Sequence, residues 1–252
     1  MNEQRIVLKQ RRDLSQIIET SVNVYRQNFW PLFQIAAIVI PLGIASAVLQ
    51  DAVGTGVGPG IATAVLGLAQ LVVYAIAWCA LLAGLGDFAQ NKAIEFPRAY
   101  DAAFDRFLTF IAAVLRAFFH VLLFYITIIG IPWGIQRGVR WTFVGQAVVL
   151  DGTSAKAALA YSADAVIGSW WRTLGILIVV SILIGVPSSI LSAIFILAPP
   201  IVSGTVSAVV LALGLPLYAI ATTLLYLDLK SRKESVAADA ELPTSNADEG
   251  SP

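Results

Sequence analysis

The sequence predicts an all-α, polytopic membrane protein with about six transmembrane helices in three hairpins and amphipathic helices at the interface. Of its 252 residues, 58% are hydrophobic and only 13% are charged, and the mean hydropathy is +0.80, above the range of soluble domains. Residues 173–227 carry no charged side chain. One helix of that length would be about 80 Å long, against a bilayer core of about 30 Å. Pro199 and Pro200 interrupt this stretch near its middle, so we expect it to cross the membrane twice.

The first 28 residues predict a cytoplasmic amphipathic leader. Within it, residues 13–28 have helical periodicity, and Asp13 and Gln16 have the spacing of a capping box. The residues that share one face of this helix are Leu14, Ile17, Ile18, Ser21, Val22 and Tyr25. The apolar run that follows, 29–50, is about twice as long as the apolar part of a signal peptide, so we expect a retained span.

Six spans are predicted from the apolar stretches and the breaks between them. Glycine-rich residues 51–60 separate the first two spans, and polar residues 87–106, with Pro97 opening a surface helix, separate the second from the third. Residues 107–150 are too long for one crossing, and residues 130–132 supply the turn. The expected spans are 29–50, 61–86, 107–129, 132–150, 171–197 and 201–227, which form a membrane domain over residues 29–228.

After the fourth span, the pattern predicts a surface helix and a tail. The turn at 151–153 leads into an alanine-rich helix over residues 154–167, which is expected to lie on the membrane surface. Trp170 and Trp171 follow it, as is typical of the membrane interface. Residues 229–252 lack the apolar content to fold and predict a disordered cytoplasmic tail.

Lysine and arginine are distributed as the positive-inside rule requires for six spans. The leader carries five, the segment between spans two and three carries three, the segment between spans four and five carries two when Arg172 at the very start of span five is included, and the tail carries three. The alternate connections carry none. We therefore expect a multi-pass protein of the cell membrane with both termini in the cytoplasm.

The third and fourth spans differ from the others because they contain basic residues at membrane depth. Arg116 and His120 are four residues apart, and Arg137 and Arg140 are three apart, so each pair lies on one helical face and the two faces can meet in the hairpin. An intramembrane cation costs at least about 2.5 kcal/mol. The group therefore predicts a site for an anion or a lipid phosphate.

A structural alternative for these basic residues stays open. The arginines can extend to the interface, bond to helix-end carbonyls, or pair with acidic residues near the spans. The candidate partners are Asp101, Asp105 and Asp151.

The chain lacks common catalytic and cofactor motifs. It contains no H-E-x-x-H, G-x-S-x-G, P-loop or C-x-x-C pattern, and one histidine with one cysteine, Cys79, cannot form a protein-rich zinc site, so no metal or cofactor is expected. The predicted spans hold no acidic residue, which argues against a cation relay. A formal net charge of zero predicts no nucleic-acid partner. Asp151 is the candidate acid for a lipid-modifying reaction at the cytoplasmic interface.

Three stretches, residues 13–41, 139–175 and 222–234, carry a resemblance that extends over most of the chain. They are rich in apolar residues punctuated by Arg, Trp, Asp and Ser, as in VRWTFVGQAVVLDG. The sequence resembles a family of prokaryotic membrane proteins that includes the membrane domain of some glycerophosphoryl diester phosphodiesterases. The resemblance implies a six-helix membrane domain and transfers no catalytic residue.

These observations rank three functions. The first is a non-enzymatic membrane protein that organises or accompanies membrane or lipid processes, with membrane lipids, a second copy or another membrane protein as partners. The second is a small transporter or channel component for an anionic or amphiphilic solute, indicated by prolines within spans and by the basic residues. The third is the lipid-modifying enzyme.

Overall fold

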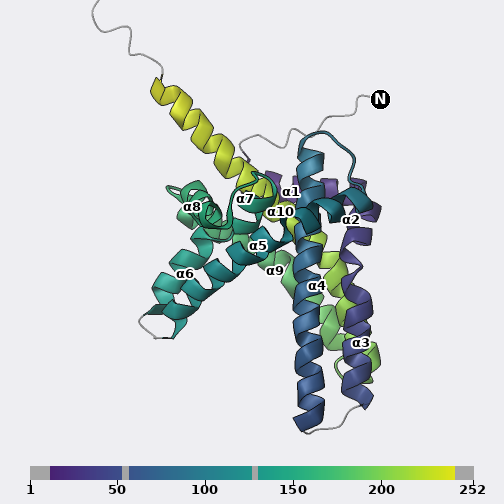
Figure 1. The fold of residues 1–252 in the computed structure, drawn as a ribbon. Helices are drawn as coiled ribbons and strands as arrows, with labels where there is room; N and C mark the ends of the chain where they lie inside the picture. Colours follow the sequence, from purple (N-terminus) through teal and green to yellow (C-terminus); the bar gives the residue numbers. More distant parts are fainter. Residues whose placement is uncertain (1–11, 53–56, 127–129, 242–252) are drawn as a thin grey trace, which may run out of the picture.

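The computed structural model describes residues 12–52, 57–126 and 130–241, which form ten helices and no strand (Figure 1). The helices are α1 (Leu14–Gln27), α2 (Phe29–Ala36), α3 (Val39–Ala52), α4 (Val57–Ala89), α5 (Phe96–Tyr125), α6 (Ile131–Arg140), α7 (Val144–Val149), α8 (Ala155–Val166), α9 (Trp170–Ile194) and α10 (Pro200–Glu241).

Helix α10 lies at the centre of the fold. It packs against α1, α2, α3, α4, α8 and α9, and every residue from Ala219 to Leu229 is buried. Small residues bring α3 and α10 close together, because a Cβ atom at Gly43 would lie only 2.6 Å from the Cβ atom of Ala208. Close contact through small side chains is the usual way in which membrane helices associate.

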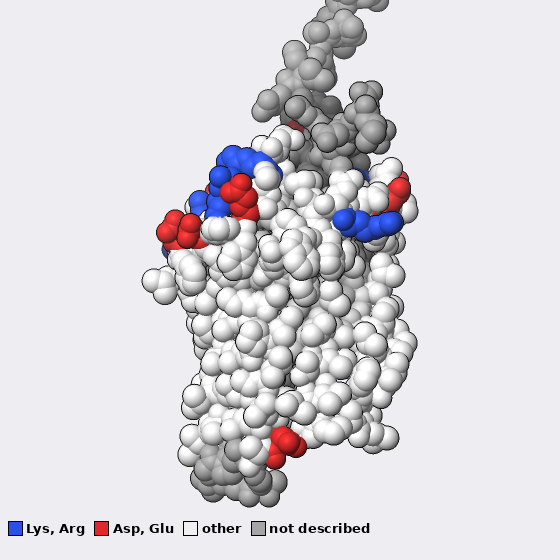
Figure 2. All heavy atoms as spheres, turned by 90° about the vertical axis from the view of Figure 1, so that its right-hand side faces the viewer, with Lys and Arg blue, Asp and Glu red and all other residues white. Residues whose placement is uncertain are grey.

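The charged residues gather toward one end of the molecule. Figure 2 shows most of the Lys, Arg, Asp and Glu on the visible face near that end, then a wide band without charge, and one acidic side chain at the opposite end. The surface helix α8 begins there with a cap, in which the Ser154 Oγ accepts from the Ala157 N–H at 3.4 Å. At the start of α1, the Asp13 N–H donates to Gln16 Oε1 at 3.1 Å, which confirms the predicted capping pair.

Within the described residues, four helices are long and apolar enough to cross a membrane, and α2 and α3, which are bent by 41°, meet the same criteria when taken as one span. The predicted spans 61–86, 171–197 and 201–227 correspond to α4, to α9 with the turn after it, and to α10. The predicted span 107–129 corresponds to the later part of α5, which also includes the predicted surface helix, while residues 127–129 lie outside the described residues. The count of six is not confirmed.

The predicted fourth span, 132–150, is two short helices instead of one. Helix α6 has 10 residues and α7 has 6, with a turn at 141–143 between them. Ser162 of α8 stabilises this turn, because its hydroxyl donates to the Arg140 carbonyl at 2.7 Å and accepts from the Phe143 N–H at 3.1 Å. A residue from another helix thus replaces hydrogen bonds that a continuous helix would make.

The α5–α6 hairpin is inclined to the main bundle. Near its start, α5 packs on the end of α4, where Gly84 faces Ala99, and it then leans away (Figure 1). The shared end of α5 and α6 lies well short of the end at which α3 and α4 meet (Figure 1). Helix α6 returns to α8 and to the start of α9, where the Trp170 Nε1–H donates to the Gln136 carbonyl at 3.3 Å.

The tail differs from the prediction in its first part. Residues 229–241 continue α10 as helix, and residues 242–252 lie outside the described residues. Lys230 and Lys233 reach Asp151 and Asp164, each at 2.8 Å. These ion pairs tie the start of the extension to Asp151, in the turn before α8, and to α8 itself.

Candidate functional site

The predicted basic cluster (Arg116, His120, Arg137 and Arg140) is partly brought together around one indole. The Arg137 guanidinium carbon lies 5.5 Å from the centroid of the Trp141 ring. The His120 ring meets the same indole edge to face, with 5.7 Å between centroids. Residues of α5 and α6 therefore converge at Trp141, the first residue of the turn after α6.

The arginines of the basic cluster have no acidic partner in the described part of the chain. No carboxylate oxygen there lies within 4.0 Å of Arg116, Arg137 or Arg140. Arg172 and Lys230, by contrast, each pair with an aspartate at 2.8 Å. Arg26 and Lys156, on the surface helices, also lack such a partner among the described residues. The hairpin thus concentrates positive charge that no described carboxylate neutralises.

The His120 ring has a defined hydrogen-bonding state. Its Nδ1 lies 2.6 Å from the Arg116 carbonyl oxygen. Because a carbonyl oxygen only accepts, Nδ1 donates the hydrogen, and Nε2 is the nitrogen left to bind a ligand. Arg116 itself is exposed and is linked to His120 through this backbone contact.

The arginines of α6 lie nearer the charged end than the sequence predicts. Arg140 is half-buried, and its carbonyl is bound by Ser162 of the surface helix α8. Gln136, one residue before Arg137, is bound by Trp170 at the start of α9. The prediction placed these arginines deep within a span, whereas the broken helix brings them to the level of α8.

Asp151, the candidate interfacial acid, is engaged in structural contacts. The Tyr226 hydroxyl donates a short hydrogen bond to Asp151 Oδ2, and Lys230 Nζ lies 2.8 Å from Oδ1. Both carboxylate oxygens thus have partners on α10, and neither partner belongs to the basic cluster. The structure pairs it with α10, which is a stabilising arrangement.

A buried charged cluster around Asp228 escaped the sequence analysis. Asp228 is 0% exposed and accepts from the Arg12 backbone N–H at 2.6 Å, from Arg172 Nη1 at 2.8 Å and from Arg232 Nε at 3.0 Å. Burial lowers the pKa of the Arg12 guanidinium, and the nearby Asp228 carboxylate opposes this shift. A sequence signal existed, since Arg172 and Asp228 flank the apolar hairpin and a hairpin returns both its ends to one side.

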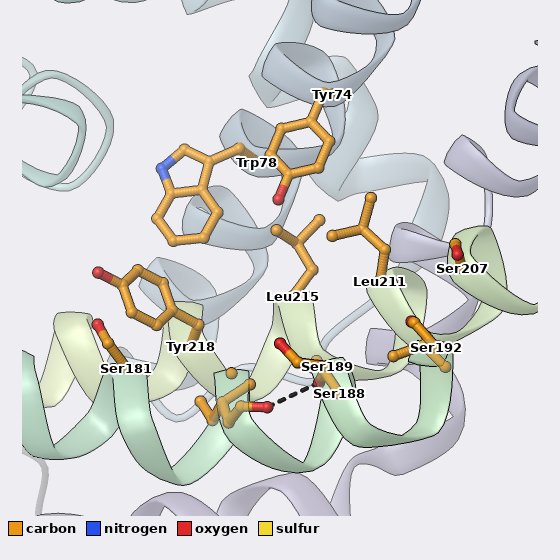
Figure 3. A pocket seen from close by; sticks show the side chains of 14 residues that line it. Tyr74, Trp78, Ser181, Ser188, Ser189, Ser192, Ser207, Leu211, Leu215 and Tyr218 are labelled. Atoms are coloured by element: carbon orange, nitrogen blue, oxygen red, sulfur yellow. Dashed lines mark hydrogen bonds between the residues drawn. The ribbon is translucent and has the colours of Figure 1, made fainter. Parts of the chain in front are cut away.

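A cavity of about 640 Å³, the serine cavity, lies between α4, α9 and α10. Figure 3 shows Tyr74 and Trp78 of α4 on one wall and serines of α9 on another. The Ser188 hydroxyl donates to the Ile184 carbonyl at 2.7 Å (Figure 3). The serines that line it are Ser181, Ser188, Ser189, Ser192 and Ser207.

A second cavity of about 460 Å³, the hairpin cavity, lies between α4, α5, α6 and α7. Tyr74 and Trp78 line both the hairpin cavity and the serine cavity, so the two cavities share this part of α4. Trp141 also lines the hairpin cavity, so the basic cluster lies beside it. Neither cavity was predicted from the sequence, although Ser181, Gly185 and Ser192 recur on one face of α9.

The fold and this site define an all-α protein with several helices able to cross a membrane and a basic hairpin beside apolar cavities. Among the described residues, no group of three His, Cys, Asp or Glu side chains is placed to hold a metal ion. No family model, curated protein or solved structure matches the chain. The resemblance to the phosphodiesterase membrane domain therefore stays a prediction.

Proposed function

We propose that this chain is a non-enzymatic protein of the cell membrane that binds an anionic amphiphile, with the phosphate of its headgroup at the basic cluster. The main evidence is that Arg137 and His120 both contact Trp141, which lines the hairpin cavity. Arginines without carboxylate partners in a medium of low dielectric are stabilised by a bound phosphate. The adjoining cavity offers apolar surface to the chain of the ligand.

The proposed topology has four crossings and one re-entrant hairpin in place of six crossings. The crossings are α2 with α3, α4, α9 and α10, and α5 with α6 forms the hairpin. Asp228, in the later part of α10, contacts Arg12 and the start of α9. Tyr100, near the start of α5, donates to the Ile35 carbonyl of α2 at 2.7 Å. The chain between α4 and α9 must therefore return to the end from which it left.

The length of α6 supports the hairpin over a second pair of crossings. Its 10 residues extend for only about 15 Å, half of a bilayer core, so it cannot complete a return crossing. An even number of crossings keeps both termini on one side, and we assign that side to the cytoplasm. All described Lys and Arg outside the hairpin then lie on the cytoplasmic side, as the positive-inside rule requires.

The proposal is tested by measuring how much anionic phospholipid stays bound to the protein through purification. Arg137→Gln combined with Arg140→Gln removes two charges from the cluster and is expected to lower the amount of bound anionic phospholipid about tenfold, equivalent to ~1.4 kcal/mol. Bound lipid is measured by mass spectrometry after purification in mild detergent. The matched control is Lys156→Gln, which removes a charge from an exposed site on α8. Equal lipid in the double variant and the control would contradict the proposal.

A transporter or channel component for an anionic or amphiphilic solute is the second candidate. The serine cavity favours it, because hydroxyl groups from α9 and α10 line a volume of about 640 Å³ beside Pro187 of α9. This function requires water in the cavity. A cysteine at Ser189 would then react with a membrane-impermeant thiol reagent, whereas protection supports an occupying lipid.

A further inference from the structure

We propose that the bound amphiphile is a phospholipid with two acyl chains, which straddles Tyr74 and Trp78 with one chain in the hairpin cavity and the other in the serine cavity. This inference rests on the proposed function, because the basic cluster holds the headgroup. It adds the class of ligand and the position of each chain.

The shared wall of the two cavities carries the inference. Tyr74 and Trp78 lie one helical turn apart on α4, and both line both cavities. The Trp78 ring also approaches Tyr218 of α10, with 5.9 Å between centroids. An aromatic ridge with an open volume on each side matches a forked ligand better than a single chain.

The size and the chemistry of both cavities fit acyl chains. Their volumes of about 640 and 460 Å³ lie within the range of about 300–1,000 Å³ that is typical of ligand sites. Both surfaces are mainly apolar. The Ser188 hydroxyl is satisfied by the Ile184 carbonyl, as serines in membrane helices commonly are, so its presence does not oppose an apolar chain.

Charge complementarity selects an anionic lipid as the occupant. Trp141 lines the hairpin cavity and contacts both Arg137 and His120. The cavity therefore has a cationic group at its border and leads from there to Tyr74 and Trp78. A headgroup phosphate at Trp141 places the glycerol of the lipid between the basic cluster and the aromatic ridge.

Two glycines allow each cavity to be filled separately. A Cβ atom at Gly185, in the serine cavity, or at Gly138, in the hairpin cavity, would meet no atom within 4 Å. Gly185→Leu and Gly138→Leu therefore add a side chain to one cavity each without a clash at Cβ. The matched controls are Gly175→Leu in α9 and Gly67→Leu in α4, which are equally open positions that line neither cavity.

The experiment measures binding of phosphatidylglycerol, of lysophosphatidylglycerol and of phosphatidylcholine to the delipidated full-length protein by native mass spectrometry. The wild-type protein is expected to bind phosphatidylglycerol at least about tenfold more tightly than the other two lipids. Gly185→Leu is expected to lower phosphatidylglycerol binding to the level of the single-chain lipid, whereas Gly138→Leu lowers binding of both anionic lipids. Ser189→Leu provides a second obstruction of the serine cavity if Gly185→Leu does not fold.

The outcomes separate this inference from the proposed function. If both anionic lipids bind equally and Gly185→Leu and Ser189→Leu behave as Gly175→Leu does, the two-chain assignment is overturned while the headgroup site stands. If phosphatidylcholine binds as tightly as phosphatidylglycerol, both the inference and the proposed function are overturned.

Discussion

Asp228 shows how single residues fix the relation between distant segments. A carboxylate with no exposed surface is costly unless hydrogen bonds replace its lost water. Here the replacement comes from the Arg12 backbone and from the side chains of Arg172 and Arg232. The two guanidinium groups also donate to the Arg12 carbonyl, at 2.6 and 3.0 Å. One residue of α10 thereby holds Arg12, which lies just before α1, and the start of α9.

Asp228→Asn is expected to destabilise the protein by about 3 kcal/mol, because it leaves two half-buried guanidinium groups without their counter-charge. Thermal unfolding in detergent, followed by loss of the monodisperse peak in size-exclusion chromatography, measures the effect. Asp164→Asn is the control, since its carboxylate is 68% exposed and its pair with Lys233 contributes at most about 1 kcal/mol. Equal destabilisation by the two substitutions would show that the Asp228 cluster does not have this role.

The break between α6 and α7 also depends on a buried polar side chain from a distant part of the chain. Ser162 is 0% exposed, and its hydroxyl serves both the Arg140 carbonyl and the Phe143 N–H. The break ends α6 beside α8, and Trp141 follows at the border of the hairpin cavity. If the helix were not broken here, residues 132–150 would form one helix, and Trp141 would not lie in a turn.

Ser162→Ala is expected to cost about 1–3 kcal/mol, because it leaves two backbone groups in a buried position without a partner. The same thermal unfolding assay measures this loss. Ser203→Ala is a suitable control, since Ser203 lies in the first turn of α10, where its hydroxyl bonds only to nearby backbone carbonyls. A loss of stability in Ser203→Ala that matches the loss in Ser162→Ala would refute a specific role for Ser162.

Local patterns predicted the elements that local interactions determine. The capping pair Asp13 and Gln16 and the helix beginning near Ser154 were both expected, and both depend on residues three positions apart. The turn at 141–143 depends on Ser162, which is 19 residues from Phe143, so no local pattern contains it. Periodicity alone also cannot tell an inclined hairpin from two crossings.

The candidate site was predictable in part for the same reason. The residue types and the facing pairs of the basic cluster follow from spacing, and the structure brings His120 and Arg137 to one indole. The two cavities depend on how α4, α5, α9 and α10 pack, which a single chain without its fold does not specify. The position of Tyr74 and Trp78 between the two cavities therefore could not be predicted from the sequence.

In the whole molecule, the path of the chain decides on which side of the membrane its charged residues lie. The chain leaves the charged end after α4 and is back at that end at the start of α9. The intervening helices α5 and α6 carry the three arginines of the basic cluster, Arg116, Arg137 and Arg140, none of which has a described acidic partner. A hairpin that enters from the cytoplasmic side keeps all three near anionic lipid headgroups, whereas two full crossings would place its turn outside the cell.

The topology is tested with single cysteines in a Cys79→Ala background and a membrane-impermeant thiol reagent added to intact cells. Leu197, which is 96% exposed in the turn between α9 and α10, is expected to label from outside as Leu197→Cys, and Lys92→Cys only after permeabilisation. Ile131→Cys, at the start of α6, distinguishes the two topologies. A re-entrant hairpin protects it from the external reagent, because its turn stays within the membrane. Labelling of Ile131→Cys at the rate of Leu197→Cys would establish two crossings and would remove the physical basis for placing the arginines on the cytoplasmic side.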